Sequence, residues 1–444
     1  MNNMYATRNP LIVLERVQPA FSQLILKHEG IDFPIYVNET AAEVLRICDG
    51  TKRISDIHKI LSDRYGEPVS EIAEKLHDFW IMSSKCNHII LSEQPININN
   101  TFEVLGSKEF WTPDLLSVEI THNCPLKCKH CFLSAGQGET MSNTLWHLIL
   151  NSITTMSIPQ VQLTGGEPLL HPAFFDMLDD LLNLGVITHI FTSGVVFSEE
   201  ILNRFADYSN HKKRILFQIS LDGLEECHDS FRGVKGSFKR SIAFVREIVK
   251  LGYKVSVGVT VTNQTLEELI ELCRLCKSIG VSVVRIGGVS NRGRAKDNSL
   301  SSTSEELSNM NTYKTTLAEM FESESFKVQL NEENNSNATD YLMNCGLGQT
   351  SVKIDPVGYV YPCIMASVPY ANINNESLLD IQKKYSRRFE KLSPPSEQQC
   401  SECDRLSLCN KCIVEGCLNS DGSCRWFSNN YTNLKGCALA NNNE

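Results

Sequence analysis

The stretch that decides the fold is THNCPLKCKHC, residues 121–131, which places three cysteines at positions 124, 128 and 131. A tetrahedral zinc site usually has four protein ligands, and a cubane iron–sulfur cluster has one ligand for each iron. Three thiols at such short spacing therefore leave a fourth position for a different ligand. The apolar run LLSVEIT, residues 115–121, predicts a strand that carries this motif at its carboxyl end.

Length and composition exclude several classes of protein. The chain has 444 residues, enough for about two or three domains, and 42% of them are hydrophobic, as in folded globular proteins. A net charge of -10 argues against non-specific binding to nucleic acid. The N-terminus lacks the apolar core of a signal peptide, and every apolar run is too short to span a bilayer. We therefore expect a cytoplasmic protein without a membrane span.

The 17 cysteines need an explanation, because disulfides rarely persist in the cytoplasm. Their uneven distribution favours metal or cluster ligation. Besides the three in the opening motif, nine lie toward the C-terminus: Cys345, Cys363, Cys400, Cys403, Cys409, Cys412, Cys417, Cys424 and Cys437. The remaining five are expected to be structural: Cys48, Cys86, Cys227, Cys273 and Cys276.

Alternation of apolar segments with amphipathic helices begins at residue 114. This pattern predicts an α/β fold with a parallel sheet, either open or curled into a partial barrel. The expected strands are residues 115–121, 160–165, 186–193, 215–223, 254–262 and 281–289. In such folds the working residues gather at the carboxyl ends of the strands. TGGEP (164–168), FTSG (191–194) and ISLDG (219–223) stand at three of these ends.

The N-terminal region has a different pattern. Three short strands precede three amphipathic helices, expected at residues 38–48, 54–66 and 69–84, and this order predicts a winged-helix-like domain over residues 1–95. A polar, turn-rich linker is expected at 96–113. The core would then occupy residues 114–310, and a cysteine-rich domain residues 311–444.

The spacing of Cys124, Cys128 and Cys131 resembles the signature of the radical S-adenosylmethionine (radical SAM) superfamily. The resemblance implies a partial (β/α)6 barrel and a 4Fe–4S cluster held by these three thiolates. The amino and carboxylate groups of S-adenosylmethionine would chelate the fourth iron. His122 and His130 are expected to shape the loop and not to bind metal. A zinc knuckle or a set of buried thiols is the alternative.

The same resemblance implies a set of cofactor-binding residues. TGGEP matches the motif that binds the methionine amino group, and Ser193 stands where many relatives have Asn. The arginine of HDSFRG resembles the one that pairs with the methionine carboxylate. The implied set, which contains no assigned catalytic residue, is Gly165, Gly166, Glu167, Ser193, Ser220, Asp222 and Arg232.

The C-terminal cysteines resemble the SPASM domain, which binds two auxiliary iron–sulfur clusters. The resemblance implies Cys345, Cys363 and Cys412 for the first cluster. It implies Cys400, Cys403, Cys409 and Cys424 for the second. A zinc ribbon is the alternative.

One spacing in this domain departs from the usual pattern. Only two residues separate Cys409 from Cys412 where three are usual, a shortening shared by peptide thioether-forming members. Cys417 and Cys437 are surplus. Cys417 could complete the first auxiliary cluster, or the fourth iron of that cluster could stay open for substrate.

Residues 36–57, YVNETAAEVLRICDGTKRISDI, resemble the leader-peptide recognition element of pyrroloquinoline quinone biosynthesis (PqqD-like). Such modules add an extended leader to a sheet edge through main-chain hydrogen bonds. A DNA-binding winged helix is the alternative, which the acidic composition disfavours.

Together these resemblances imply a radical SAM enzyme that modifies a ribosomally made precursor peptide. It would cleave S-adenosylmethionine reductively to a 5'-deoxyadenosyl radical, using an electron donor such as flavodoxin or ferredoxin. The expected product is a Cys thioether cross-link, as in sactipeptide maturases. The alternatives are carbon–carbon cyclisation, epimerisation, or a non-catalytic iron–sulfur or zinc scaffold. The GGEP and SLDG motifs count against a scaffold, because a scaffold needs no S-adenosylmethionine site.

Overall fold

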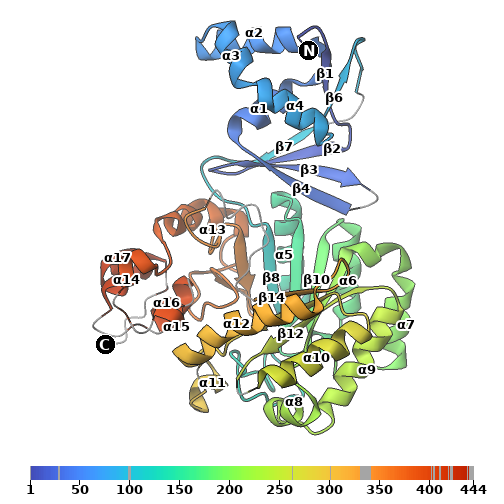
Figure 1. Cartoon of the computed structure of the whole chain (residues 1–444), viewed down its shortest axis with the longest axis vertical. Helices are drawn as coiled ribbons and strands as arrows, with labels where there is room; N and C mark the ends of the chain where they lie inside the picture. Colours follow the sequence, from blue (N-terminus) through green and yellow to red (C-terminus); the bar gives the residue numbers. More distant parts are fainter. Residues whose placement is uncertain are drawn as a thin grey trace. The chain divides into compact units, whose positions relative to one another are not determined.

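The computed structural model describes residues 2–28, 31–98, 102–262, 264–300, 302–330, 342–401, 403, 406–409, 412–418, 420, 424–437 and 439. The chain divides into two compact units, Met1–Trp111 and Thr112–Glu444, whose elements are labelled in Figure 1. None of the helices in the described ranges combines the length and apolar character that a bilayer crossing requires.

The described residues of the first unit form two small sheets and four helices. One sheet has the order β5-β1-β6 and the other β4-β3-β2-β7. The strands are β1 Tyr5–Arg8, β2 Ile12–Val17, β3 Ser22–His28, β4 Ile31–Val37, β5 Asp49–Arg53, β6 Ile89–Ser92 and β7 Glu103–Gly106. The helices are α1 Glu39–Ile47, α2 Ile54–Tyr65, α3 Val69–Lys75 and α4 His77–Lys85.

The sequence predicted part of this unit. β2, β3 and β4 lie where three strands were expected, and α1 and α2 match two of the expected helices. The third expected helix is divided at Leu76, whose φ of -94° and ψ of 0° interrupt helical geometry between α3 and α4. Within the segment expected to be a linker, β7 pairs in parallel with β2. The winged-helix arrangement itself stays a prediction.

The second unit is built on one ten-stranded sheet with the order β14-β13-β12-β11-β10-β9-β8-β15-β16-β17. The strands are β8 Leu115–Thr121, β9 Gln160–Gly165, β10 Ile187–Thr192, β11 Ile215–Ser220, β12 Lys254–Thr260, β13 Val283–Gly287, β14 Lys327–Leu330, β15 Ser351–Ile354, β16 Tyr359–Tyr361 and β17 Ala371–Asn372. The parallel α/β fold is confirmed, and the six expected strands correspond to β8 to β13. β14 adds a parallel strand beyond them.

Helices follow the parallel strands and cover the sheet (Figure 1). They are α5 Asn143–Met156, α6 Phe174–Asn183, α7 Glu199–Asp207, α8 Glu225–Arg232, α9 Ser237–Lys250, α10 Leu266–Ser278, α11 Arg294–Asp297 and α12 Ser304–Phe321. On α6, the residues Phe174, Met177, Leu178 and Leu181 recur at helical spacing and are buried in the core. The predicted domain boundary between residues 310 and 311 falls inside α12.

The C-terminal region adds short helices to a second, smaller core. The helices are α13 Leu378–Tyr385, α14 Glu397–Cys400, α15 Leu406–Cys409, α16 Ile413–Leu418 and α17 Arg425–Gly436. This core surrounds the buried Trp426, whose indole N–H donates to the Ser393 carbonyl at 3.0 Å. Leu347, Phe389 and Leu434 pack within it.

This region joins the parallel sheet through β15, which pairs in parallel with β8. Across that pair, Lys353 Nζ lies 3.1 Å from Glu119 Oε1, and the two side chains are only 3% and 2% exposed. Each charge is therefore compensated mainly by the other, because water does not reach them.

We predict that Lys353→Met lowers the free energy of unfolding of the cluster-free protein by about 3–5 kcal/mol, because Glu119 is left buried without its cation. Urea denaturation measures the change. Lys250→Met is the matched control, since Lys250 pairs with Glu247 on the exposed surface of α9 and its loss should cost less than about 1 kcal/mol.

The double variant Lys353→Met/Glu119→Leu should regain most of the lost stability, because both buried charges are then gone. Equal decreases in the free energy of unfolding for Lys353→Met and Lys250→Met would contradict this account of the β8–β15 pair.

Candidate functional site

The loops that follow β8, β9, β10 and β11 meet at one edge of the sheet, because parallel strands place their carboxyl ends together. The three-cysteine loop follows β8, and the GGE residues begin at Gly165, the last residue of β9. Ser193 follows β10, and Ser220 is the half-buried last residue of β11. The fold therefore brings the sequence-predicted residues of the parallel core to one edge of the sheet.

The three cysteines of the loop form one cluster. Cys124, Cys128 and Cys131 pack together with the buried side chains of Leu126 and Val195. The loop is also held by its own hydrogen bonds. The Cys124 N–H donates to the Gly136 carbonyl at 2.7 Å, and the Cys131 N–H donates to the Cys128 carbonyl at 3.3 Å.

The electrostatics of these thiols fit a bound iron–sulfur cluster. The pKa of Cys124 is raised to about 12, by burial first and also by Cys128, Glu167 and Cys131, while a backbone hydrogen bond from Leu126 lowers it. The thiolate forms therefore need a compensating cation, which metal binding supplies. Among the described residues, no three His, Cys, Asp or Glu side chains gather closely enough to hold a single metal ion. A cluster requires no such gathering, because each thiolate binds a different iron.

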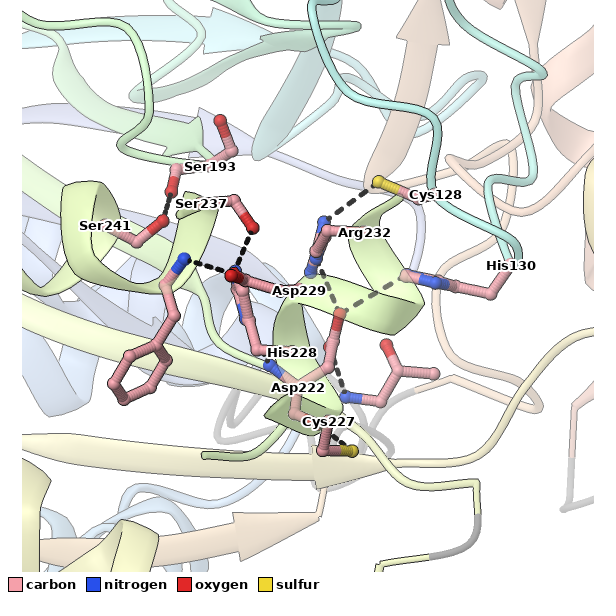
Figure 2. Close-up of polar contacts among 12 residues, drawn as sticks. Cys128, His130, Ser193, Asp222, Cys227, His228, Asp229, Arg232, Ser237 and Ser241 are labelled. Atoms are coloured by element: carbon pink, nitrogen blue, oxygen red, sulfur yellow. Dashed lines mark hydrogen bonds and ion pairs between the residues drawn. The ribbon is translucent and has the colours of Figure 1, made fainter. Parts of the chain in front are cut away.

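Arg232, at the end of α8, provides a positive charge beside the loop. Figure 2 shows its guanidinium between Cys128 and Asp222. Nη1 donates to the Cys128 sulfur at 3.6 Å, and Nε lies 2.6 Å from Asp222 Oδ2. Burial lowers the pKa of Arg232, but Asp222 and Cys128 raise it more, so the net shift is upward and the side chain stays charged.

Asp222 is fully buried and interacts with several parts of the site. Oδ1 accepts the Thr260 N–H at 3.0 Å, and Oδ2 lies 3.9 Å from His130 Nε2. Burial raises the pKa of Asp222, but Arg232 and then His130 lower it more, so the carboxylate is ionised. Asp222 and Arg232 are therefore each other's charged partner in this structure. Contact of either side chain with S-adenosylmethionine stays a prediction.

His130 and His122 have the contacts expected of residues that shape the loop. The His130 ring stacks on Phe231 with 4.3 Å between centroids and 6° between planes. His122 Nε2 lies 3.3 Å from Glu119 Oε2.

The two glycines of the GGE motif let β9 approach the cysteine loop. A Cβ on Gly165, which has φ +132°, would lie 2.1 Å from the Thr121 carbonyl oxygen. A Cβ on Gly166 would lie 2.4 Å from the Asn123 carbonyl oxygen. A side chain at either position would therefore displace the start of the loop. Binding of the methionine amino group by this motif stays a prediction.

Glu167 connects the ends of β9 and β10. Its fully buried carboxylate accepts hydrogen bonds from the Thr192 hydroxyl at 2.6 Å, the Ser193 N–H at 2.9 Å and the Ser193 hydroxyl. Burial raises the pKa of Glu167; the Ser193 and Thr192 hydrogen bonds lower it, but the net shift is upward. The carboxylate and Ser193 therefore fix the shape of this edge, whatever they contact in a bound cofactor.

The first C-terminal group consists of Cys345, Cys363 and Cys412. The pKa of Cys363 is raised to about 11, by burial first and then by Cys345. The pKa of Cys412 is raised to about 12, by burial first and also by Cys363 and Cys345. The structure therefore brings together the three cysteines predicted for the first auxiliary cluster, while their role as ligands stays a prediction.

The second group consists of Cys400, Cys403, Cys409 and Cys424. The pKa of Cys409 is raised to about 11 by burial and then by the other three thiols. Burial raises the pKa of Cys417 to about 12, and its interacting thiols are Cys409 and Cys424. Cys417 therefore lies beside the second group, and this placement favours an open iron in the first.

Cys437 lies apart from these interactions. It is 2% exposed in the small core around Trp426, and the charged group that affects its pKa is Arg388. Packing is therefore its evident role.

Two arginines of the site were missed by the sequence analysis. Arg292 and Arg294 flank Gly293 after β13, and the available signal was the Arg-Gly-Arg triplet beyond the last predicted strand. The Arg292 guanidinium lies 5.5 Å from the centroid of the Phe132 ring, next to Cys131. Burial lowers the pKa of Arg292 more than the neighbouring acidic groups raise it, and Cys363 and Cys412 are among those groups. Arg292 thus lies beside the three-cysteine loop, and its charge acts on the first C-terminal group.

Three family models match separate parts of the chain. Residues 118–276 match the radical SAM superfamily. Residues 345–404 match SPASM, an iron–sulfur cluster-binding domain. Residues 28–81 match coenzyme PQQ synthesis protein D (PqqD).

Two proteins of Bacillus subtilis (strain 168) are similar in sequence. The sporulation killing factor maturation protein SkfB is 26% identical over 298 residues, which cover 66% of this chain and 68% of SkfB. The antilisterial bacteriocin subtilosin biosynthesis protein AlbA is 25% identical over 413 residues, 88% of each chain.

A solved structure is similar in fold. The crystal structure of Streptococcus suis SuiB bound to its precursor peptide SuiA has a TM-score of 0.64 at 18% identity, and the match covers 95% of this chain and all of SuiB.

We predict that Glu167→Gln lowers the free energy of unfolding of the cluster-free protein by about 2 kcal/mol, because the amide keeps one oxygen and its NH2 group must face the donors of either Thr192 or Ser193. Chemical denaturation measures the change. Glu199→Gln, at the exposed start of α7, is the control and should change stability by less than about 0.5 kcal/mol. A Glu167→Gln protein as stable as the control would show that these bonds contribute nothing.

Proposed function

This chain is a radical SAM protein that also carries SPASM and PqqD-like domains, and we propose its function from that identification. The function is modification of a ribosomally synthesised precursor peptide, with formation of a Cys thioether cross-link. SkfB and AlbA are named for the maturation of a killing factor and the biosynthesis of a bacteriocin, and both are similar to this chain. This combination of domains favours a peptide-modifying enzyme over a non-catalytic scaffold.

The peptide is the principal partner in this proposal. The PqqD-like residues 28–81 lie in the first unit, where a sheet with edge strands β4 and β7 could accept an extended leader by main-chain hydrogen bonding. The SuiB structure, which contains a bound precursor peptide, supports this assignment. The predicted electron donor is a flavodoxin or ferredoxin, and the predicted compartment is the reducing cytoplasm, where the many thiols would stay reduced.

The residues of the three-cysteine loop would hold the radical SAM cluster, and the two C-terminal groups would hold the auxiliary clusters. Bound there, the first cluster and S-adenosylmethionine would supply radical chemistry, and the auxiliary clusters would supply an electron acceptor or a thiolate anchor. Arg232 maintains a positive charge at Cys128, and Asp222 keeps that guanidinium in place. Glu167, Gly165 and Gly166 maintain the shape of the edge on which S-adenosylmethionine would lie.

The observation that carries the proposal is the position of Arg292. Its guanidinium contacts Phe132 beside Cys131, and its charge interacts with Cys363 and Cys412. One buried side chain therefore lies beside the three-cysteine loop and within electrostatic range of the first C-terminal group. A peptide residue that loses hydrogen near the first cluster would thus lie close to the group expected to bind its thiolate.

We predict different failures for Cys131→Ala and Cys403→Ala. Cys131→Ala leaves two thiols in the first loop and should abolish 5'-deoxyadenosine formation. Cys403→Ala affects only the second C-terminal group, so 5'-deoxyadenosine should still form while cross-linked peptide is lost. The measurement is anaerobic reaction with the precursor peptide encoded beside this gene, with mass spectrometry of both products.

Circular dichroism and iron content must accompany this assay, because cluster ligation also contributes to folding. A folded Cys403→Ala protein that cross-links the peptide at the normal rate would contradict a mechanistic role for the SPASM domain. A wild-type mass change other than the loss of two hydrogens would contradict the thioether.

We also predict that deletion of residues 1–111, the first compact unit, leaves 5'-deoxyadenosine formation within about threefold of the full chain, since compact units can fold independently. Modification of the full precursor should fall at least about tenfold, because leader binding is lost. Liquid chromatography with mass spectrometry quantifies both products. Undiminished modification by the truncated enzyme would refute the leader-binding assignment.

A further inference from the structure

We propose that Arg294 is a positioning residue that holds the three-cysteine loop in the arrangement that binds its cluster. The proposal rests on the proposed function for the identity of the cluster. Arg294 begins α11, seven residues after the end of β13, and none of the sequence motifs includes it.

Three hydrogen bonds connect Arg294 to the loop. Its Nε donates to the Cys128 carbonyl at 2.8 Å, and its Nη1 donates to the Ala135 carbonyl at 2.6 Å. Its main-chain N–H donates to the Cys131 carbonyl at 2.9 Å. Two of these carbonyls belong to the cysteines themselves. The bonds therefore fix the peptide planes next to Cys128 and Cys131, and with them the directions in which the two thiols leave the backbone.

Gly293 makes this close approach possible. It has φ +51°, and a Cβ there would lie 2.5 Å from the Cys131 carbonyl oxygen and 2.6 Å from that of Phe132. Asn298, at the other end of α11, donates from Nδ2 to the Lys129 carbonyl at 3.0 Å. The segment 293–298, which we call the Arg294 clamp, thus contacts the loop at successive positions.

A second element holds the same loop. The N–H groups of Lys127 and Lys129 donate to the carbonyls of Arg232 and Phe231, at 3.0 and 2.9 Å, so α8 fixes the residues on either side of Cys128. The Arg294 clamp acts on the carbonyls of this part of the loop, and α8 acts on its N–H groups. The ligand geometry is therefore held by two elements from distant parts of the sequence.

The charge of Arg294 also suits an anionic ligand. Its Nη2 is buried and has no hydrogen-bond partner among the described residues. A buried unpaired donor is unfavourable, and an iron–sulfur cluster held by thiolates would supply a negative charge beside it. Loss of the guanidinium should therefore change the electronic environment of the first cluster as well as its retention.

The test compares Arg294→Ala with the wild-type chain after anaerobic reconstitution with iron and sulfide and one-electron reduction of the clusters with dithionite. The change in the electron paramagnetic resonance spectrum on addition of S-adenosylmethionine reports the first cluster selectively, because only that cluster binds the cofactor. We expect this change to be shifted or lost in Arg294→Ala. We also expect a chelator to remove about four irons per chain at least about ten times faster, since charged hydrogen bonds have been removed.

Three further variants make the comparison specific. Arg274→Ala, which removes an exposed arginine of α10, should behave as wild type. Asn298→Ala removes one bond of the clamp and should give a smaller change in the same direction. Arg294→Lys keeps the charge but cannot donate to both carbonyls, so it should lie between wild type and Arg294→Ala; it also serves if Arg294→Ala does not fold.

An unchanged spectrum and unchanged iron release in Arg294→Ala, or in Arg294→Lys if only that variant folds, would overturn the proposal. A general role in fold stability would lower the melting temperature of the cluster-free protein as much as that of the reconstituted protein, and this result would overturn it too. No peptide enters the test, so failure of peptide modification alone contradicts the proposed function and not the clamp. A wild-type chain without any response to S-adenosylmethionine would overturn both.

Discussion

Hydrogen bonding between parallel strands brings the carboxyl ends of β8 to β13 to one edge of the sheet, and the candidate site depends on this constraint. Each loop there is then fixed by a polar group of another loop. Glu167 after β9 accepts from the β10 end, and Asp222 after β11 holds Arg232 against the loop after β8. Arg294 after β13 binds the same loop through its carbonyls. The loops at this edge therefore hold one another in place through polar contacts.

Periodicity was sufficient to predict the six core strands, because it is local in sequence. The grouping of the C-terminal cysteines was implied by the resemblance to the SPASM domain, and their role as ligands stays a prediction. The first C-terminal group contains Cys345, Cys363 and Cys412 as predicted. The contacts that sequence reasoning missed are those between distant residues. Arg294 contacts residues of the loop after β8, and β15 pairs with β8. No local sequence pattern predicts either contact. The short strand β5, of sequence DGTKR, lacked the apolar alternation that identifies a strand.

The residues inferred by resemblance illustrate a second limit. Motifs show that Glu167, Ser193, Asp222 and Arg232 belong to the site, but a motif does not distinguish contact with a cofactor from support of the loop that contacts it. In the structure their polar groups satisfy one another. Buried polar groups require such partners, so a site lined by charged residues must first be internally paired. Support of the loop geometry is thus a role these side chains already have before any ligand binds.

The pairing of β15 with β8 has a consequence for the order of synthesis. Leu115 pairs with Ser351, so most of the second unit must leave the ribosome before the neighbour of β8 on that side exists. Until then, the strand that leads into the three-cysteine loop has an unpaired edge, and Glu119 lacks Lys353. The nascent chain therefore completes the support of its first cysteine loop only after the cysteines of the C-terminal region begin to emerge. Completion of the first loop's support thus requires translation of the segment that also carries Cys345.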